Sequence, residues 1–244
     1  MRKFPPALVA LILTFVPAAV RAGLDLSILP FGYIDKSSLT YESDALNYYA
    51  SPVRWGYMDR SGKVLIQPGF EDAGFFNTEG LAPVKKNGAW SIVDKKGRTV
   101  REPQGGGYIE VLPNGYFKIR KDKKTSYLDP KGRAISEERF KTAPAATEND
   151  GVVRNCKNRK GAGEGPDAYG YAIQGFSHRN LPMVGLYRLS GERISRPVFS
   201  GIETVVVGDL IRFMLRDGET VYFLLCDGVF LRPRLKQHGT WKIR

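Results

Sequence analysis

Cysteine and histidine are scarce in this sequence of 244 residues, which holds two of each. The shortage excludes histidine-rich metal cages and zinc ribbons, whose ligand sets need more of these side chains at fixed spacings. No metal site and no cofactor is therefore expected. Acidic residues are also few relative to basic ones, with 25 Asp and Glu against 37 Lys and Arg. The formal charge of +12 favours an anionic partner, although charge governs association and not fold.

Long apolar runs are also lacking, since the one pronounced stretch, residues 7–20, is shorter than the roughly 20 residues of a membrane-spanning helix. A basic pair precedes this stretch, and Ala22 ends a segment with small residues where a signal peptidase cuts. The pattern predicts a secretory signal peptide at residues 1–22, cleaved after Ala22, rather than a membrane anchor. The mature chain, residues 23–244, is then exported, periplasmic or secreted, with no transmembrane segment. Cleavage removes three cations and leaves a charge of +9.

Export bears on the two cysteines, Cys156 and Cys226, because disulfides persist outside the cytosol. An even count of two permits one pairing, and the sequence favours a disulfide between them slightly. The alternative is two unpaired thiols, with Cys226 as a core residue at the end of an apolar run.

What the chain does contain is an internal repeat of about 35 residues. The segment that begins at Trp55 returns at Trp90 and again at Thr125. An Asp, a Gly and a basic residue keep the same register in all three copies, at Asp59, Asp94 and Asp129, at Gly62, Gly97 and Gly132, and at Lys63, Arg98 and Arg133. We expect clear repeats at 55–89, 90–124 and 125–140, an insertion loop at about 141–180, and degenerate repeats at 181–231.

Each repeat has the composition of short strands joined by tight turns. An alternating, aromatic-rich strand begins at Trp55, and Asp59-x-x-Gly supplies a turn. A returning strand follows and is expected to end at Pro68, because proline cannot donate to a ladder. Asn87-Gly88 then predicts a hairpin into the next copy. The chain is therefore expected to be all-β, in antiparallel three-stranded units that stack as a propeller-like ring or an open curved stack.

These residues resemble the WG-repeat (KWG-repeat) family of bacterial proteins, whose unit begins Trp-Gly-Tyr-Ile-Asp-Lys-x-Gly-Lys. The match is close from Trp55 to Gly62, and later copies depart from it, with Ser91 in place of Gly and Thr125 in place of Trp. The resemblance implies an all-β repeat protein, usually exported or envelope-associated, that is used for binding. The family supplies no catalytic residues.

The repeated aromatic and aspartate positions have structural and functional interpretations. Exposed aromatics at fixed spacing stack on sugars or bases, but one large aromatic per unit at one register is what a stacked core needs, so we expect core. The repeated Asp is expected to form turns rather than to bind metal or catalyse.

Basic residues recur at comparable positions of the repeats and would align into one stripe if the units stack. The candidate binding residues are Lys85, Lys86, Lys95, Lys96, Lys118, Arg120, Lys121, Lys123 and Lys124, with Arg159 and Lys160 from the Gly-rich insertion. The alternative is a solvated turn face. A phosphate cradle in the insertion is disfavoured because the Gly-Lys-Ser/Thr of a P-loop is missing.

The sequence as a whole predicts an exported, non-enzymatic binding or scaffold protein of the bacterial cell envelope. Its partner would be a protein or an anionic envelope polymer, and nucleic acid is not expected for an exported chain. A secreted carbohydrate-acting enzyme or toxin-like effector is the alternative, since 25 acids could supply the two carboxylates of a glycosidase. The oligomeric state is left open.

Overall fold

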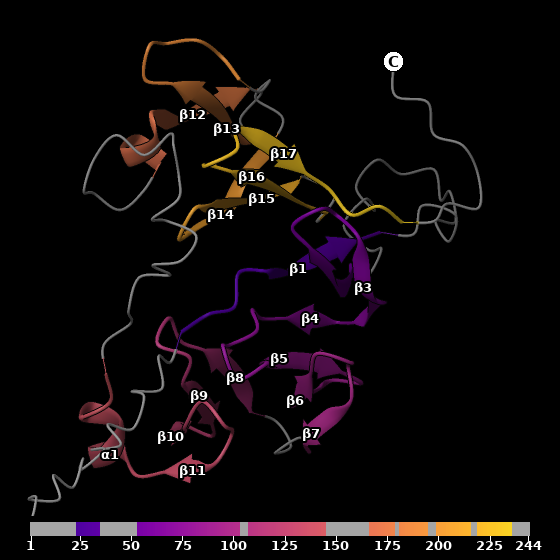
Figure 1. The fold of residues 1–244 in the computed structure, drawn as a ribbon, viewed down its shortest axis with the longest axis vertical. Helices are drawn as coiled ribbons and strands as arrows, with labels where there is room; N and C mark the ends of the chain where they lie inside the picture. Colours follow the sequence, from indigo (N-terminus) through magenta and orange to yellow (C-terminus); the bar gives the residue numbers. More distant parts are fainter. Residues whose placement is uncertain are drawn as a thin grey trace, which may run out of the picture.

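The structure, a computed structural model, describes residues 23–34, 53–102, 107–144, 166–178, 181–194, 199–215 and 219–235. These residues form β-strands, one short helix, α1 (Glu137–Lys141), and one 3₁₀ turn, η3 (Pro166–Tyr169). The predicted all-β class is confirmed (Figure 1). Among the described residues, no helix has the length and apolar character needed to cross a membrane.

The strands form four antiparallel sheets, none of which closes on itself. The first sheet holds β1 (Ile28–Tyr33), β2 (Arg54–Asp59) and β3 (Val64–Phe70). The second holds β4 (Asp72–Ala73), β5 (Leu81–Lys86), β6 (Ala89–Asp94) and β7 (Thr99–Arg101). The third holds β8 (Tyr108–Val111), β9 (Phe117–Lys121), β10 (Lys124–Leu128) and β11 (Ala134–Ile135).

The fourth sheet is a six-stranded meander at one end of the molecule (Figure 1). It consists of β12 (Tyr171–His178), β13 (Leu181–Arg188), β14 (Phe199–Val207), β15 (Leu210–Leu215), β16 (Thr220–Leu224) and β17 (Val229–Leu231). The degenerate repeats predicted at 181–231 thus join one continuous sheet and do not form separate three-stranded units. The choice between a ring and an open stack stays a prediction.

The sheets are offset from the sequence repeats, which corrects the predicted three-stranded unit. β5 belongs to the first repeat, but it pairs along its whole length with β6 of the second. β9 of the second repeat pairs in the same way with β10 of the third. In both cases a two-residue turn brings the strands together, so pairing across the repeat boundary requires little loop closure. Consecutive repeats are therefore interlocked through shared sheets.

The predicted Asp-x-x-Gly turn is confirmed in all three copies. The carboxylates of Asp59, Asp94 and Asp129 each accept the backbone N–H groups two and four residues later, at 2.8–3.0 Å. The glycine three residues after each Asp has a φ of +76° to +84°, which an L side chain rarely adopts. The repeated Asp and Gly are thus explained by turn formation.

The end of the returning strand was predicted wrongly, because β3 continues through Pro68 to Phe70. The register between β2 and β3 shifts twice between Trp55↔Phe70 and Met58↔Val64, and Pro68 lies within this irregular stretch. Proline is tolerated there because the ladder is interrupted. The bulged strand presses on Gly56, where an added Cβ would lie 2.6 Å from the Ile66 carbonyl oxygen.

This contact explains the glycine of the Trp-Gly pair and predicts that Gly56→Ala destabilises the protein by about 2 kcal/mol or more, since backbone must shift. The second repeat carries Ser91 at this register, and β7 ends opposite the next residue, Ile92. Gly69→Ala in the same sheet is the matched control, because its Cβ would meet only one atom, at 3.9 Å. Urea unfolding of both variants checks the prediction, and equal losses would contradict it.

Four clusters of buried side chains form the core within and between neighbouring sheets. Trp55 and Tyr57 are buried in one of them, as predicted for the repeated aromatics, whereas Trp90 is only partly buried. Phe140, aligned with Phe70 in the repeats, lies on α1 instead of a strand and stacks on Tyr127 with the ring centroids 3.9 Å apart.

Two sets of polar contacts link different sheets through residues that lie far apart in the sequence. The guanidinium of Arg60, in the β2–β3 turn, donates two hydrogen bonds to the fully buried carboxylate of Asp209, in the β14–β15 turn. The buried amide of Asn77 donates to the carbonyl oxygens of Gly115 and Pro130 in the third sheet, at 2.9 and 2.7 Å. These contacts fix the first sheet against the fourth and the second against the third.

Several predicted features lie outside the described residues. They are the signal peptide at residues 1–22, Cys156, the part of the predicted insertion loop between 145 and 165, and the candidate cations Arg159 and Lys160. The end of the loop predicted at about 141–180 is not a loop, because β12 (Tyr171–His178) lies there and pairs with β13. Cys226 follows β16 and is partly buried against the core of the fourth sheet. The disulfide therefore stays a prediction, which the mass of the mature chain under non-reducing conditions would test.

Candidate functional site

The described candidate cations lie in three places. Lys85 and Lys86 end β5, and Lys95 and Lys96 lie in the β6–β7 turn. The remaining five belong to the β9–β10 hairpin: Lys118, Arg120, Lys121, Lys123 and Lys124. The end of β5, with Lys85 and Lys86, lies beside the start of β6, whereas Lys95 and Lys96 follow the end of β6. The length of β6 therefore separates these two pairs. The single stripe predicted from the sequence therefore divides into separate groups.

The β5–β6 and β9–β10 turns occupy equivalent places in successive repeats, but the second has a lysine where the first has a glycine. Asn87 and Gly88 have φ of +51° and +75°, the conformation of a type I′ hairpin turn. Asp122 and Lys123 have the same conformation, with φ of +48° and +63°. A lysine in the left-handed region costs about 1–2 kcal/mol relative to a normal backbone conformation. The β9–β10 turn thus carries a cation at a position that favours glycine.

The β9–β10 hairpin also holds like charges close together. Lys121 lies directly opposite Lys124, and such a pair is destabilising. These two side chains and Lys123 are exposed. Two nearby acids offset part of the charge of the hairpin's five cations: Asp122, and Glu110 of β8, whose carboxylate lies 3.2 Å from Arg120. The positive excess of the third sheet is therefore concentrated at this hairpin.

The cations at the end of β5 are more nearly neutralised. Asp72 lies directly opposite Lys85 in the ladder of β4 and β5. The carboxylate of Glu71 accepts the Gly88 N–H at 3.1 Å and so lies at the same hairpin turn. The β9–β10 hairpin is therefore the stronger candidate for binding an anion.

An aromatic pair connects the two hairpins. Trp90 of β6 and Tyr108 of β8 meet edge to face, with their ring centroids 4.9 Å apart. Lys85 is the ladder partner of Trp90, and Arg120 is the ladder partner of Tyr108. Directly opposite residues share a face, so Lys85 lies beside Trp90 in the second sheet and Arg120 beside Tyr108 in the third, and the contact between the two rings joins these pairs into one row. We refer to these four residues as the aromatic–cation row.

Sequence reasoning missed Tyr108, because the repeat aligns it with Ala73 and so shows no recurring aromatic at this register. It is 45% exposed, more than the other large aromatic residues in the described part of the chain. The signal that could have found it is a tyrosine at the start of a strand that pairs with the most basic segment of the chain. The pairing itself is a tertiary property.

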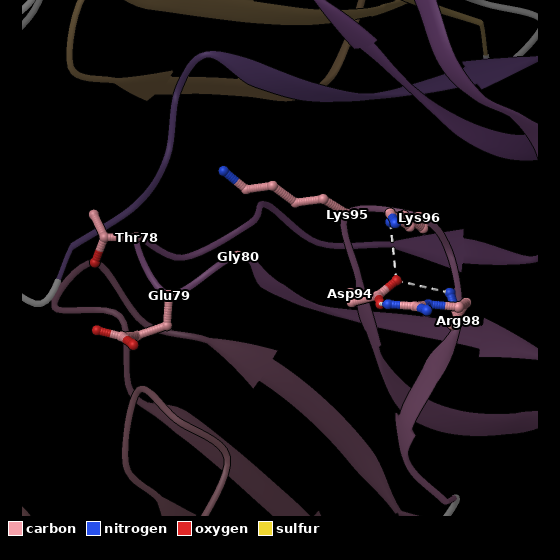
Figure 2. A pocket seen from close by; sticks show the side chains of 7 residues that line it. All are labelled: Thr78, Glu79, Gly80, Asp94, Lys95, Lys96 and Arg98. Carbon is pink, nitrogen blue, oxygen red and sulfur yellow. Dashed lines mark hydrogen bonds and ion pairs between the residues drawn. The ribbon is translucent and has the colours of Figure 1, made fainter.

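Lys95 and Lys96, in the β6–β7 turn, border an open hollow of about 350 Å³ between two turns (Figure 2). Its lining residues are Thr78, Glu79, Gly80, Asp94, Lys95, Lys96 and Arg98. Arg98 pairs with Asp94 at 2.6 Å, and Lys95 pairs with Asp25 at 2.7 Å. Three of the charged lining residues are therefore paired, Asp94 and Arg98 with each other and Lys95 with Asp25 outside the lining.

Two of the acids at the hollow, Asp94 and Asp25, have their pKa lowered by these contacts. The hydrogen bond from Arg98, supported by backbone N–H groups, lowers the pKa of Asp94 below its ordinary value despite slight desolvation. Partial burial raises the pKa of Asp25, but hydrogen bonds from Lys95 and Ser27 outweigh it and leave that pKa lowered. Among the described residues, no cluster of three or more His, Cys, Asp or Glu is arranged to hold a metal ion.

Residues 55–90 match the family model of the WG-containing repeat. The match covers the first repeat, from the strand that begins at Trp55 to the Trp of the next copy, and it confirms the resemblance predicted from the sequence. The comparison with curated proteins gives no match.

Proposed function

We propose that this chain, which carries a WG-type β-repeat at residues 55–90, is an exported, non-enzymatic binding or scaffold protein of the bacterial cell envelope. It presents the basic β9–β10 hairpin to an anionic polymer or to an acidic protein. Export rests on the signal pattern at residues 1–22, and the basic surface rests on the charges of the hairpin.

The observation that carries the proposal is the backbone of Lys123. A hairpin with glycine at this position and fewer facing cations would be more stable, yet the chain places Lys121, Lys123 and Lys124 at one exposed turn. Strain of this kind persists where the surrounding structure compensates for it, and it concentrates at functional sites. A bound anion that neutralises several exposed cations together relieves the repulsion between them, which favours binding.

A carbohydrate-acting enzyme or toxin-like effector is the alternative from a different class. A glycosidase needs two carboxylates on either side of the scissile bond. Glu79 and Asp94 both line the hollow, but Asp94 already accepts two backbone N–H groups and pairs with Arg98. This commitment of Asp94 to its turn favours the binding proposal.

The proposal predicts that Lys123→Gly weakens binding to polyphosphate about two- to fivefold and lowers the slope of log affinity against log salt by about 1. The same change should leave thermal stability unchanged or raise it, because glycine relieves the positive φ. Titration of the mature chain at several salt concentrations, with thermal unfolding of each variant, measures both quantities.

Lys96→Ala is the matched control, since it removes one exposed cation from the β6–β7 turn, outside the β9–β10 hairpin. We expect it to leave the affinity almost unchanged. Binding that does not depend on salt, or equal losses in the two variants, would count against the hairpin as the binding surface.

A further inference from the structure

The exposed ring of Tyr108 is the starting observation, because it lies beside the basic hairpin and has a fixed orientation. Trp90 packs edge to face against it at 4.9 Å and is itself anchored to the core of the third sheet. A ring held in this way binds a ligand with little loss of side-chain entropy. Aromatic faces of this kind pack favourably against the C–H groups of a sugar ring, because the π face is negative.

Arg120 supplies a cation next to this ring. It lies directly opposite Tyr108 on the neighbouring strand, so the two Cβ atoms are about 5 Å apart and the side chains share a face. Glu110 occupies one edge of the guanidinium at 3.2 Å, and a guanidinium carries five N–H groups, so donors remain for a second carboxylate. Arg120 is well placed for this role because its side chain is 55% exposed.

Further cations extend the surface on both sides of the aromatic pair. Lys85 lies at the far end of the row, beside Trp90. Asp72 lies directly opposite Lys85 in the ladder and offsets part of its positive charge. Lys121, Lys123 and Lys124 follow Arg120 at the turn of the β9–β10 hairpin, where Lys121 and its ladder partner Lys124 have the strand parity opposite to that of Arg120. The row therefore places two aromatic rings between two cations, Lys85 and Arg120.

We infer that the aromatic–cation row binds an acidic polysaccharide whose carboxylates are carried on the sugar rings, as in a polymer of uronic acids. The adjacency of Tyr108 and Arg120 matches a ligand in which a pyranose face and a carboxylate belong to the same unit. A polyphosphate has charge without a ring, and an acidic peptide has no ring beside each carboxylate. The inference rests on the proposed function and specifies its ligand class.

The test compares polygalacturonate with three probes that each lack one feature: dextran has rings without charge, polyphosphate has charge without rings, and polyglutamate is an acidic peptide. Binding to the mature chain is measured by calorimetry at low salt, and the tryptophan fluorescence of the chain, to which Trp90 contributes, gives a second readout. We expect polygalacturonate to bind tightest, and dextran to bind weakly.

Three variants assign the effect to the row. Tyr108→Leu should weaken polygalacturonate binding about three- to tenfold and leave polyphosphate binding unchanged, because only the ring is lost. Tyr108→Phe should retain binding, since it keeps the ring. Arg120→Gln keeps the platform and should weaken polygalacturonate binding as well, which tests the inference even if Tyr108→Leu fails to fold.

Polygalacturonate affinity that is unaffected by both Tyr108→Leu and Arg120→Gln would overturn the inference. So would polyphosphate or polyglutamate binding as tightly as polygalacturonate, although the proposed function would then stand. If none of the polyanions bound at low salt, both the inference and the proposed function would fail.

Discussion

Replacing Arg60 with alanine is expected to lower the free energy of unfolding by about 3–5 kcal/mol, the largest effect of any exchange considered for this protein. The reason lies in Asp209, whose carboxylate is fully buried and takes both hydrogen bonds of the guanidinium, at 3.0 and 2.6 Å. Without Arg60 the carboxylate is left buried and uncompensated, since its desolvation is no longer offset. Chemical denaturation of the mature chain measures the loss.

Two further variants separate this effect from a general weakening. Arg98→Ala removes a guanidinium from the equivalent turn of the second repeat, where its ion pair with Asp94 is exposed, and should lower stability by about 1 kcal/mol or less. Arg60→Met combined with Asp209→Leu removes both charges and should recover most of the lost stability. If the double variant were as unstable as Arg60→Ala, the explanation through an unpaired buried charge would be wrong.

The exchange Asn77→Leu is expected to lower stability by about 3 kcal/mol or more. The amide is fully buried, donates to two carbonyl oxygens of the third sheet and accepts the Leu81 N–H at 3.0 Å. Leucine has a similar volume but leaves these three backbone groups without a partner, and the penalty for a buried unsatisfied group exceeds the gain from the hydrogen bond itself. Thermal and urea unfolding measure the change.

Asn114→Leu is the control for this experiment, because Asn114 occupies a turn of the third sheet and makes an exposed amide contact with the Pro144 carbonyl oxygen at 3.2 Å. We expect its effect on stability to be about 1 kcal/mol or less. Asn77→Asp should fall well below wild type as well, since it retains an acceptor for Leu81 but loses both donors and buries a charge. Stability close to wild type in Asn77→Leu would contradict the assigned role.

Local features of the fold followed from the sequence because their causes are local. The Asp-x-x-Gly turns and the Asn87-Gly88 hairpin depend on residues within five positions of one another, and the structure has them as predicted. The strand that was expected to end at Pro68 is the exception, because its continuation depends on a bulge against β2. The offset between the sheets and the repeats was missed for a similar reason. A strand can pair with the strand before it or the strand after it in the chain, and the three-stranded unit assumed pairing within one repeat.

Part of the candidate site likewise follows from the local sequence, and part depends on packing between sheets. Lys121, Lys123 and Lys124 are visible in the sequence as a basic run, and a two-residue turn between strands accounts for their proximity. The contact of Tyr108 with Trp90 depends on how the third sheet packs against the second. The repeat alignment carries no information on that packing, because the counterpart of Tyr108 in the first repeat is Ala73, which has no ring.

The sequence by itself determined that this protein is an all-β chain of aromatic-rich repeats with a WG-type unit at residues 55–90 and an excess of positive charge. These properties depend on composition and on spacings shorter than one repeat. Only the tertiary structure decided that the predicted stripe of cations splits along β6 and that Arg60 meets Asp209, 149 positions away. Such contacts arise from packing between sheets, where burial and shape complementarity select partners that no local pattern specifies.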